Sequence, residues 1–198
     1  MLFDGALDVD FIFLPKQSIK HAFEDDIVKE ILKRGYRILI DKIKLEQFLP
    51  QNRNVSELNL MLSKQEFQNL TNDFWYHAVW TAKKVMRSEI WTAKHCLDTY
   101  MKTKLLNIIE CHARVVNGLE YDTWHNGRFI EEWAENWVIE KLHSCFSHYD
   151  KVDIKSALLS TMDLFRVLAV EVAEKCQYDY PVIADKYTTD WVTTTLHL

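Results

Sequence analysis

The chain has 198 residues, of which 48% are apolar, and its formal net charge is −5. This length suits one domain, or a small domain joined to a larger one, and the apolar fraction is sufficient for a hydrophobic core. The mild acidic excess argues against a nucleic-acid-binding surface, and the apolar runs are too short for a membrane-spanning helix.

The four cysteines are scattered along the chain and form no CxxC pair. This spacing predicts reduced, mostly buried thiols in a cytoplasmic protein rather than the disulfide framework of a small secreted domain. The first residues show no basic segment before an apolar one, so no signal peptide is expected. The acidic excess slightly favours a cationic small molecule as ligand, and we expect neither nucleic acid nor a membrane as a partner.

Residues 1 to about 50 have the pattern of an α/β layer. Residues 9–14 form a β-branched and apolar run that Pro15 stops, which predicts a strand. Residues 18–34 have helical spacing before Gly35, and residues 36–41 form a second extended segment. Two short strands and one helix cannot cover both faces of a sheet, so this segment is expected to be part of a larger α/β layer.

The remainder of the chain has helical periodicity. Ser63 and Glu66 have the spacing of a capping box at the start of the first long helix. Further helices are expected over residues 89–116, with Gly118 as the stop, and over residues 128–143 and 153–176. Four amphipathic helices with short links predict a bundle. The expected inward residues are Phe67, Leu70, Phe74, Ala78, Thr81 and Val85 on the first helix and Ile154, Leu158, Phe165, Leu168 and Val172 on the last.

The predicted fold class is therefore α+β, mostly α. We expect an incomplete α/β part, the C-terminal part of a larger domain, over residues 1–60 and a helical domain over residues 61–198.

Asp8 and Asp10 are the first candidates for chemistry. Alternate residues of a strand project to the same face, so the two carboxylates are expected to point together. Carboxylate oxygens, completed by phosphate oxygens of a substrate, are the ligands that Mg²⁺ prefers. The alternative is that both aspartates are solvent-facing residues at the edge of a sheet.

Basic residues gather where the first long helix ends and the next begins. Lys83, Lys84 and Arg87 lie on the former, and Lys94 and His95 on the latter. Such cations can grip phosphates, although a solvated helix face has the same composition. Two further groups give weaker signals. Glu89, Asp98, Glu110 and Asp163 could attract a polycationic ligand, with ordinary helix-surface roles as the alternative. His143, Cys145 and His148 could bind a metal, with ordinary helix-end roles as the alternative.

Five stretches, in the same order, resemble the streptomycin (aminoglycoside) 6-adenylyltransferase family. Residues 74–89 (FWYHAVWTAKKVMRSE) are similar to its first long helix, and the similarity continues through residues 93–98 (AKHCLD). Residues 162–174 (MDLFRVLAVEVAE) and 178–181 (YDYP) resemble its last long helix and the aromatic-proline segment after it. Residues 4–15 (DGALDVDFIFLP) look like the family strand that carries the third active-site carboxylate.

The resemblance implies a nucleotidyltransferase domain followed by a helical domain. It implies ATP as the donor, Mg²⁺ as the metal and the 6-hydroxyl of streptomycin as the acceptor, with AMP transferred and pyrophosphate released. By position, Asp10 corresponds to the third carboxylate, as metal ligand or as base, and Asp8 is its neighbour. Lys83 stands where the family helix presents a lysine, which implies contact with the triphosphate.

The sequence departs from the family pattern in two places. The family's Gly-Ser loop and Asp-x-Asp strand are not found before Asp10, and only Gly127-Arg128 remains of a double Gly-Lys step. A single family carboxylate is a poor Mg²⁺ site. We therefore predict little or no adenylyltransferase activity for this polypeptide alone.

Three interpretations follow. The first is an enzyme of this family whose true start lies upstream of Met1. The second is a catalytically inactive, truncated remnant that acts at most as a helical binding module. The third is a helical protein that docks other proteins.

Overall fold

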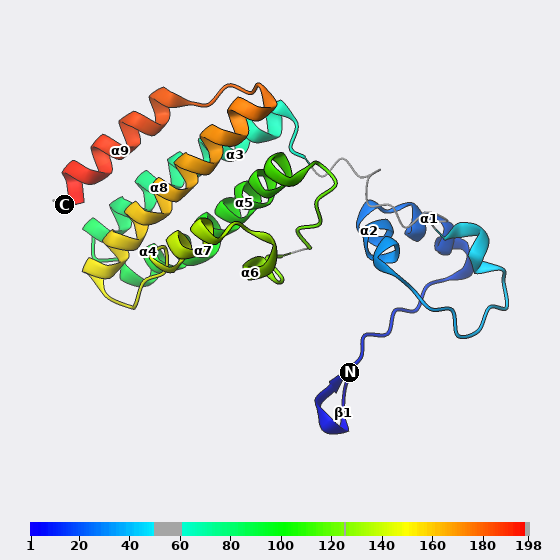
Figure 1. Cartoon of the computed structure of the whole chain (residues 1–198). Coiled ribbons are helices and arrows are strands. Elements are labelled where there is room, and N and C mark those ends of the chain that lie inside the picture. The colour runs from blue at the N-terminus through cyan, green and yellow to red at the C-terminus, as the bar shows by residue number, and fades with distance from the viewer. Residues whose placement is uncertain (50–60, 125, 197–198) are drawn as a thin grey trace. The chain divides into compact units, whose positions relative to one another are not determined.

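The computed structural model describes residues 1–49, 61–124 and 126–196. Tertiary contacts divide the chain into two units, Met1–Leu58 and Asn59–Leu198 (Figure 1). Helices predominate, and the described residues contain one two-stranded sheet, so the fold class is α+β and mostly α, as predicted. Within the described ranges, no helix is both long and apolar enough to cross a membrane.

The sheet of the first unit is a minimal hairpin. Strands β1 (Leu2–Phe3) and β2 (Leu7–Asp8) are antiparallel, with Leu2 opposite Asp8. The 3-10 turn η1 (Asp4–Ala6) joins them, and Gly5 has a φ of 75°, a left-handed conformation that glycine adopts readily. The predicted strand over residues 9–14 is wrong, because this ladder ends at Asp8 and those residues pair with no other strand in the described part of the unit.

The predicted helix over residues 18–34 is divided in two. Asp25 has an extended conformation (φ −66°, ψ 131°), and its side chain accepts a hydrogen bond from the Val28 backbone N at 3.2 Å, which starts the second helix. That helix ends before Gly35, as predicted. The second predicted strand, over residues 36–41, is also wrong, since the segment is irregular. The helical segments of the unit are η2 (Lys16–Ser18), α1 (Ile19–Glu24), α2 (Asp26–Arg34) and η3 (Leu45–Phe48).

The second unit is a helical bundle (Figure 1). Its first helix begins with the predicted capping box: the Ser63 hydroxyl accepts from the Glu66 backbone N, and the Glu66 carboxylate accepts from the Ser63 backbone N at 2.8 Å. Its helices are α3 (Lys64–Met86), α4 (Ile90–His95), α5 (Lys102–Asn117), α6 (Ile130–Trp133), α7 (Asn136–His143), α8 (Lys151–Cys176) and α9 (Val182–Leu196), and a π-helical turn, η5 (Cys96–Met101), joins α4 to α5.

The helices differ from the sequence prediction in three respects. The expected helix over residues 89–116 is continuous and stops at Gly118 (φ 113°) as predicted, but the π-helical turn within it was not expected. The expected helix over residues 128–143 is broken at Ala134, whose backbone is extended. Helix α9 was not predicted at all.

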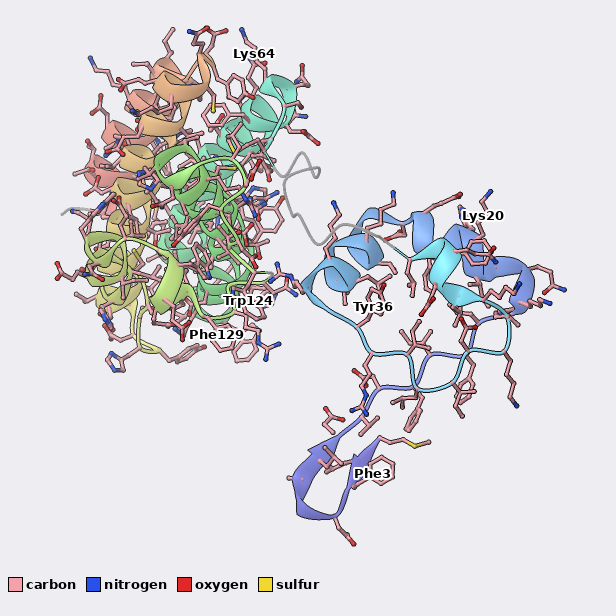
Figure 2. All side chains as sticks on the ribbon, turned by 45° about the vertical axis from the view of Figure 1, so that its right-hand side comes forward. Phe3, Lys20, Tyr36, Lys64, Trp124 and Phe129 are labelled. Atoms are coloured by element: carbon pink, nitrogen blue, oxygen red, sulfur yellow. The ribbon has the colours of Figure 1, made fainter. Side chains whose placement is uncertain are left out.

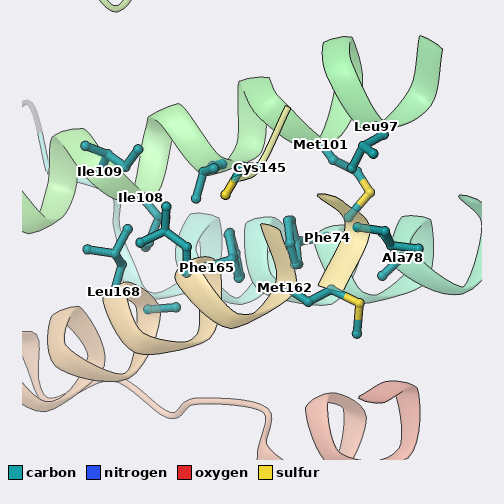
Figure 3. Packing of buried hydrophobic residues seen from close by; sticks show 14 of the residues in the cluster. Phe74, Ala78, Leu97, Met101, Ile108, Ile109, Cys145, Met162, Phe165 and Leu168 are labelled. Carbon is teal, nitrogen blue, oxygen red and sulfur yellow. The ribbon is translucent and has the colours of Figure 1, made fainter. Parts of the chain in front are cut away.

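The core lies where α8 packs against α3, α5 and α9. The rings of Phe74 and Phe165 stack at its centre, with centroids 3.6 Å apart and planes 5° from parallel (Figure 3). Met101 and Ile108 contribute from the π-helical turn and α5, and Leu168 from α8 (Figure 3). All the inward residues predicted for α3 and α8 are buried, so apolar periodicity identified both helix faces correctly.

Candidate functional site

The two predicted aspartates lie at the end of the small hairpin. Asp8 is the last residue of β2, and its carboxylate is 3.9 Å from the Met1 ammonium, with both groups exposed. Asp10 follows beyond the strand and is also exposed. The carboxylates suit Mg²⁺ in ligand chemistry, but over the described ranges no group of three or more His, Cys, Asp or Glu is placed to hold an ion. The roles of Asp8 and Asp10 therefore stay predictions.

Lys83 lies on the exposed face of α3, close to its C-terminal end. Its Nζ is 5.7 Å from the centroid of the Trp191 ring on α9. Two neighbouring cations share one carboxylate: Lys84 Nζ is 2.6 Å from Glu89 Oε2, and the exposed Arg87 Nη1 is 3.9 Å from Glu89 Oε1. Within the described part of the chain, no carboxylate pairs with Lys83. Lys83 thus keeps an exposed charge that an incoming anion can meet, and so does Arg87, because the single Glu89 carboxylate cannot balance both Lys84 and Arg87.

The acidic residues singled out in the sequence do not converge on one site. Glu89 pairs with Lys84, Asp98 Oδ2 is 2.6 Å from Lys94 Nζ, and Asp163 Oδ1 is 2.6 Å from Arg166 Nη1. Each of these three carboxylates is therefore paired with a cation close to it on the helix surface.

Cys145 and His148 have separate partners, and His143 lies exposed at the end of α7. The Cys145 thiol is buried 3.4 Å from the Lys141 carbonyl oxygen. His148 Nδ1 lies 2.8 Å from Asp153 Oδ2, and the His148 backbone N donates to the same oxygen. In this part of the described chain, the three residues lie at a helix end and in the turn after it, and their side chains do not converge to form a metal-binding site.

Three glutamates that the sequence analysis did not consider line one open groove. Glu132, Glu135 and Glu140 lie around a space of about 590 Å³ that Trp133 and Trp137 also line. The Trp137 indole donates to Glu135 at 2.7 Å. The break between α6 and α7 brings these carboxylates together, and helical spacing in the sequence does not predict that break. The three carboxylates give this surface a negative potential.

The loop that precedes α6 contains the Gly127-Arg128 step. Trp124 and Phe129 lie close together in this loop (Figure 2), and their rings meet edge to face. The Arg128 guanidinium lies over these two rings, at 5.4 and 4.9 Å. Gly127 has a φ of 70°, and a Cβ there would stand 3.3 Å from the Leu106 side chain. Arg128 is therefore held by aromatic stacking, next to a left-handed position that favours glycine.

Asp73 is the centre of a polar cluster between α3 and α5 that sequence reasoning missed. Its Oδ2 accepts hydrogen bonds from the Tyr100 hydroxyl at 2.7 Å and from Lys104 Nζ at 3.0 Å. Partial burial opposes ionisation of Asp73, but these two donors outweigh it and lower the pKa of the carboxyl. An ionised carboxylate with its donors in place acts as a cross-link between helices rather than as a proton acceptor.

A small pocket lies beside α4 and the π-helical turn. Its volume is about 200 Å³, and Trp91, Lys94, Asp98 and Tyr149 are among its lining residues, with His95 and Thr99. Lys94 Nζ donates to Asp98 and to both the carbonyl and the hydroxyl of Ser147, which ties the loop before α8 to α4. The sequence analysis noted Lys94 and Asp98, but in different groups of residues. It did not place Tyr149 beside them, because Tyr149 reaches the pocket only in the folded chain.

This fold defines a class of protein. It is a mostly helical α+β chain that has two carboxylates at the end of a hairpin and an exposed lysine on the first long helix of its bundle. A family model described as streptomycin adenylyltransferase matches residues 1–195, and the chain belongs to that family.

Two curated relatives have names that agree with this assignment. The chain is 24% identical over 190 residues to an aminoglycoside 6-adenylyltransferase of Campylobacter jejuni and 23% identical over 186 residues to one of Bacillus subtilis (strain 168). These matches cover 94% and 91% of this chain, but the chain spans only 62% of the length of either relative.

The fold has a solved counterpart. The crystal structure of an aminoglycoside 6-adenyltransferase from Bacillus subtilis superposes with a TM-score of 0.61 at 23% identity, over 68% of this chain and 51% of that one. At this identity the superposition supports the fold alone.

Proposed function

We propose that this chain acts in the transfer of AMP from ATP to a hydroxyl group of an aminoglycoside, with streptomycin as the acceptor and Mg²⁺ as the metal. The observation that carries the proposal is the match of the streptomycin adenylyltransferase family over residues 1–195. The exposed Lys83, which pairs with no carboxylate in the described ranges, supports it as a group able to meet a nucleotide's phosphates.

The two units have separate proposed roles. Residues 1–60 belong to a nucleotidyltransferase domain as its C-terminal part, and residues 61–198 form a helical domain that binds substrate and nucleotide. The contact boundary between Leu58 and Asn59 is compatible with this division.

Three residues carry the proposed chemistry. The acceptor hydroxyl oxygen forms a bond to the α-phosphorus while the bond to the pyrophosphate oxygen breaks, and Asp10 takes the hydroxyl proton. Lys83 donates hydrogen bonds to the triphosphate and offsets its charge. Asp8 and Asp10 would be the ligands of the Mg²⁺, which supplies further charge neutralisation when bound.

The proposed partners are small molecules in the cytoplasm. All four cysteines are free thiols, and three of them are buried, which suits a reducing compartment. The net charge of −5 offers little attraction to nucleic acid or to an anionic membrane surface.

The test measures binding and turnover separately. The purified 198-residue chain is titrated with a non-hydrolysable ATP analogue in the presence of Mg²⁺, and with streptomycin, by calorimetry. AMP transfer is followed by pyrophosphate release and by the mass of the modified antibiotic. We expect both ligands to bind and turnover to be slow, and a folded chain that binds neither ligand would contradict the proposal.

Rapid turnover would support the proposed reaction but contradict the predicted inactivity of this polypeptide alone. Binding without turnover is the result expected for the helical binding module considered in the sequence analysis. Translation of the genomic DNA upstream of Met1 would show whether a Gly-Ser loop and an Asp-x-Asp strand are encoded in frame.

A further inference from the structure

A short segment between the hairpin and α1 is exposed and unpaired. Residues 10–14 belong to no helix or strand, and Figure 1 shows them as a single line that leads from the hairpin to α1. In this described segment, the backbone N–H and carbonyl groups take part in no hydrogen bond. Phe11, Ile12 and Phe13 are 55%, 81% and 89% exposed. Apolar, β-prone residues with open backbone groups form a template on which another strand can pair.

The two ends of the segment carry opposite charges. Asp8 precedes it and Lys16 follows it, and both are exposed. Within the described ranges, Asp8 contacts only the exposed Met1 ammonium, at 3.9 Å, and Lys16 pairs with no carboxylate. Pro15 has no backbone N–H, so a ladder formed along the segment ends at Leu14. The segment is therefore bounded at both ends, with an acidic side and a basic side.

We propose that two copies of the chain associate by pairing these segments as antiparallel β-strands, with the twofold axis at Ile12. Phe11 then lies opposite Phe13 of the second copy. Asp8 lies opposite Lys16 of the second copy. Both pairs occur twice, because a contact across a twofold axis is reciprocal. Main-chain hydrogen bonds provide the affinity, as in other cases of strand addition.

The side chains make this pairing self-complementary. Alternate residues of a strand point to the same face, so Phe11 and Phe13 of both copies form two cross-strand aromatic pairs on one face. The opposite charges of Asp8 and Lys16 meet at each end of the ladder and favour the antiparallel direction. A parallel pairing in register would place like charges beside each other at both ends.

Neighbouring registers are less favourable. An axis at Phe11, or half a residue to either side of the proposed axis, leaves both charged ends without a partner of opposite sign. An axis at Phe13 brings Asp10 opposite Lys16, but it places Pro15 inside the ladder, where a backbone N–H is missing. The proposed register alone among these combines the charge pairs with a ladder free of proline.

The inference goes beyond the proposed adenylyl transfer, because it concerns the assembly of the chain. A dimer that binds no ATP analogue contradicts only the proposed function. A chain that binds the analogue but stays monomeric contradicts only this inference.

Sedimentation equilibrium and hydrogen exchange of the 198-residue chain test the pairing. A ladder over residues 10–14 covers much less than the roughly 800 Å² per partner of a standard stable interface, so we expect a weak dimer, with a dissociation constant between about 1 µM and 1 mM. Backbone amides of residues 10–14 should gain protection from exchange only at concentrations at which the dimer forms.

Charge exchange tests the register. Asp8→Lys and Lys16→Asp each place like charges at both ends of a homodimer, so each variant alone should self-associate about tenfold more weakly. A mixture of the two variants restores both opposite-charge pairs and should form a heterodimer about as tight as the unmodified dimer. Lys20→Asp is the matched control, because Lys20 is an exposed lysine on α1 outside the ladder. It should leave the affinity nearly unchanged.

Proline substitution tests the ladder itself. Ile12→Pro removes a backbone N–H at the axis and should abolish the dimer, while circular dichroism shows that the helices remain. Ile40→Pro is the control, since Ile40 is a similarly exposed residue of the irregular segment 36–41 in the same unit. This variant should dimerise like the unmodified chain.

Four results would overturn the inference. The first is a monomer at every concentration up to about 1 mM. The second is a mixture of the charge variants that associates no more tightly than either variant alone. The third is protection of residues 10–14 that does not depend on concentration, accompanied by equal effects of Ile12→Pro and Ile40→Pro, which would show that the chain's own residues 36–41 cover the segment. The fourth is growth into large assemblies without a dimer, which would indicate open-ended stacking of strands.

Discussion

Arg166 on α8 and Asp185 on α9 form a salt bridge in which two nitrogens of the guanidinium face the carboxylate. Nε lies 2.8 Å from Oδ2 and Nη2 lies 2.9 Å from Oδ1, while the Tyr180 hydroxyl donates to Oδ2 at 2.8 Å. Asp185 is only 6% exposed. Burial, together with the hydrogen bond to Asp185, raises the pKa of Tyr180, so its hydroxyl stays protonated as the donor. The two helices are thus joined by a buried charge whose oxygens are satisfied.

Removal of the carboxylate should destabilise the bundle. In Asp185→Ala the Arg166 guanidinium loses its main partner in a partly buried position, and the free energy of unfolding is expected to fall by about 3–5 kcal/mol. Urea denaturation followed by circular dichroism measures the change. Asp163→Ala is the control, since this exposed partner of the same arginine should contribute less than about 1 kcal/mol. Equal losses in the two variants would contradict the assigned importance of Asp185.

The stacked phenylalanines should be equally sensitive. Phe165 is fully buried against Phe74, so Phe165→Ala leaves a cavity and should lower the free energy of unfolding by about 3–5 kcal/mol. Phe165→Leu fills most of that volume and should cost clearly less. Thermal unfolding of both variants distinguishes cavity formation from loss of a surface contact, and a difference near zero between them would argue against the packing described.

Lys102 should make stability depend on alkaline pH. Burial lowers the pKa of its ammonium from 10.5 to about 8, although Cys145 and Asp98 act in the opposite direction. Because the folded pKa is below the unfolded one, the unfolded chain binds more protons between these values, and stability rises with pH across that window. The rise is at most about 3 kcal/mol.

The comparison with Lys102→Met isolates this contribution. The difference in unfolding free energy between the variant and the unmodified chain should favour the variant below pH 8 and should shrink steadily as the pH approaches 10.5. Urea denaturation at a series of pH values measures it. A difference that is constant over this range would show that the lysine is not desolvated in the folded state.

Lys83 and Lys84 should differ in nucleotide binding although they are adjacent. Lys84 is held by Glu89, whereas Lys83 pairs with no carboxylate among the residues described. Lys83→Ala should therefore weaken binding of an ATP analogue by about tenfold or more, the loss expected for a hydrogen bond from a charged group. Lys84→Ala should change it little. Calorimetric titration makes the comparison, and a larger loss in Lys84→Ala would move the phosphate contact to that residue.

Local signals predicted the helical unit well. The capping box at Ser63, the stop at Gly118 and the buried stripes of α3 and α8 all depend on residues within a few positions of one another. Helix α9 was not predicted because its buried set includes the polar residues Asp185 and Thr188, and Asp185 pairs with Arg166 of another helix. Polar residues at inward positions hide helical periodicity.

The extended segments and the sites depended on distant parts of the chain. Residues 9–14 have strand composition, but a strand requires a partner along its length, and β1 is only two residues long. Lys83 and Lys84 could be grouped from the sequence because they are adjacent in it. Only the fold places Tyr149 beside Asp98. Only the fold, likewise, assembles Glu132, Glu135 and Glu140 around one groove. Roles taken from the family resemblance, those of Asp8, Asp10 and Lys83, stay predictions.

The π-helical turn at Cys96–Met101 has a consequence for how the chain tolerates changes in length. Its wider hydrogen-bonded rings accommodate an additional residue while α4 and α5 continue as one rod. Deletion of one amino acid here would let the turn tighten to α-helical geometry with the flanking faces still correctly oriented. The same deletion within α5 would rotate every later side chain by about 100°, since one turn takes 3.6 residues, and would carry Ile108 out of the core.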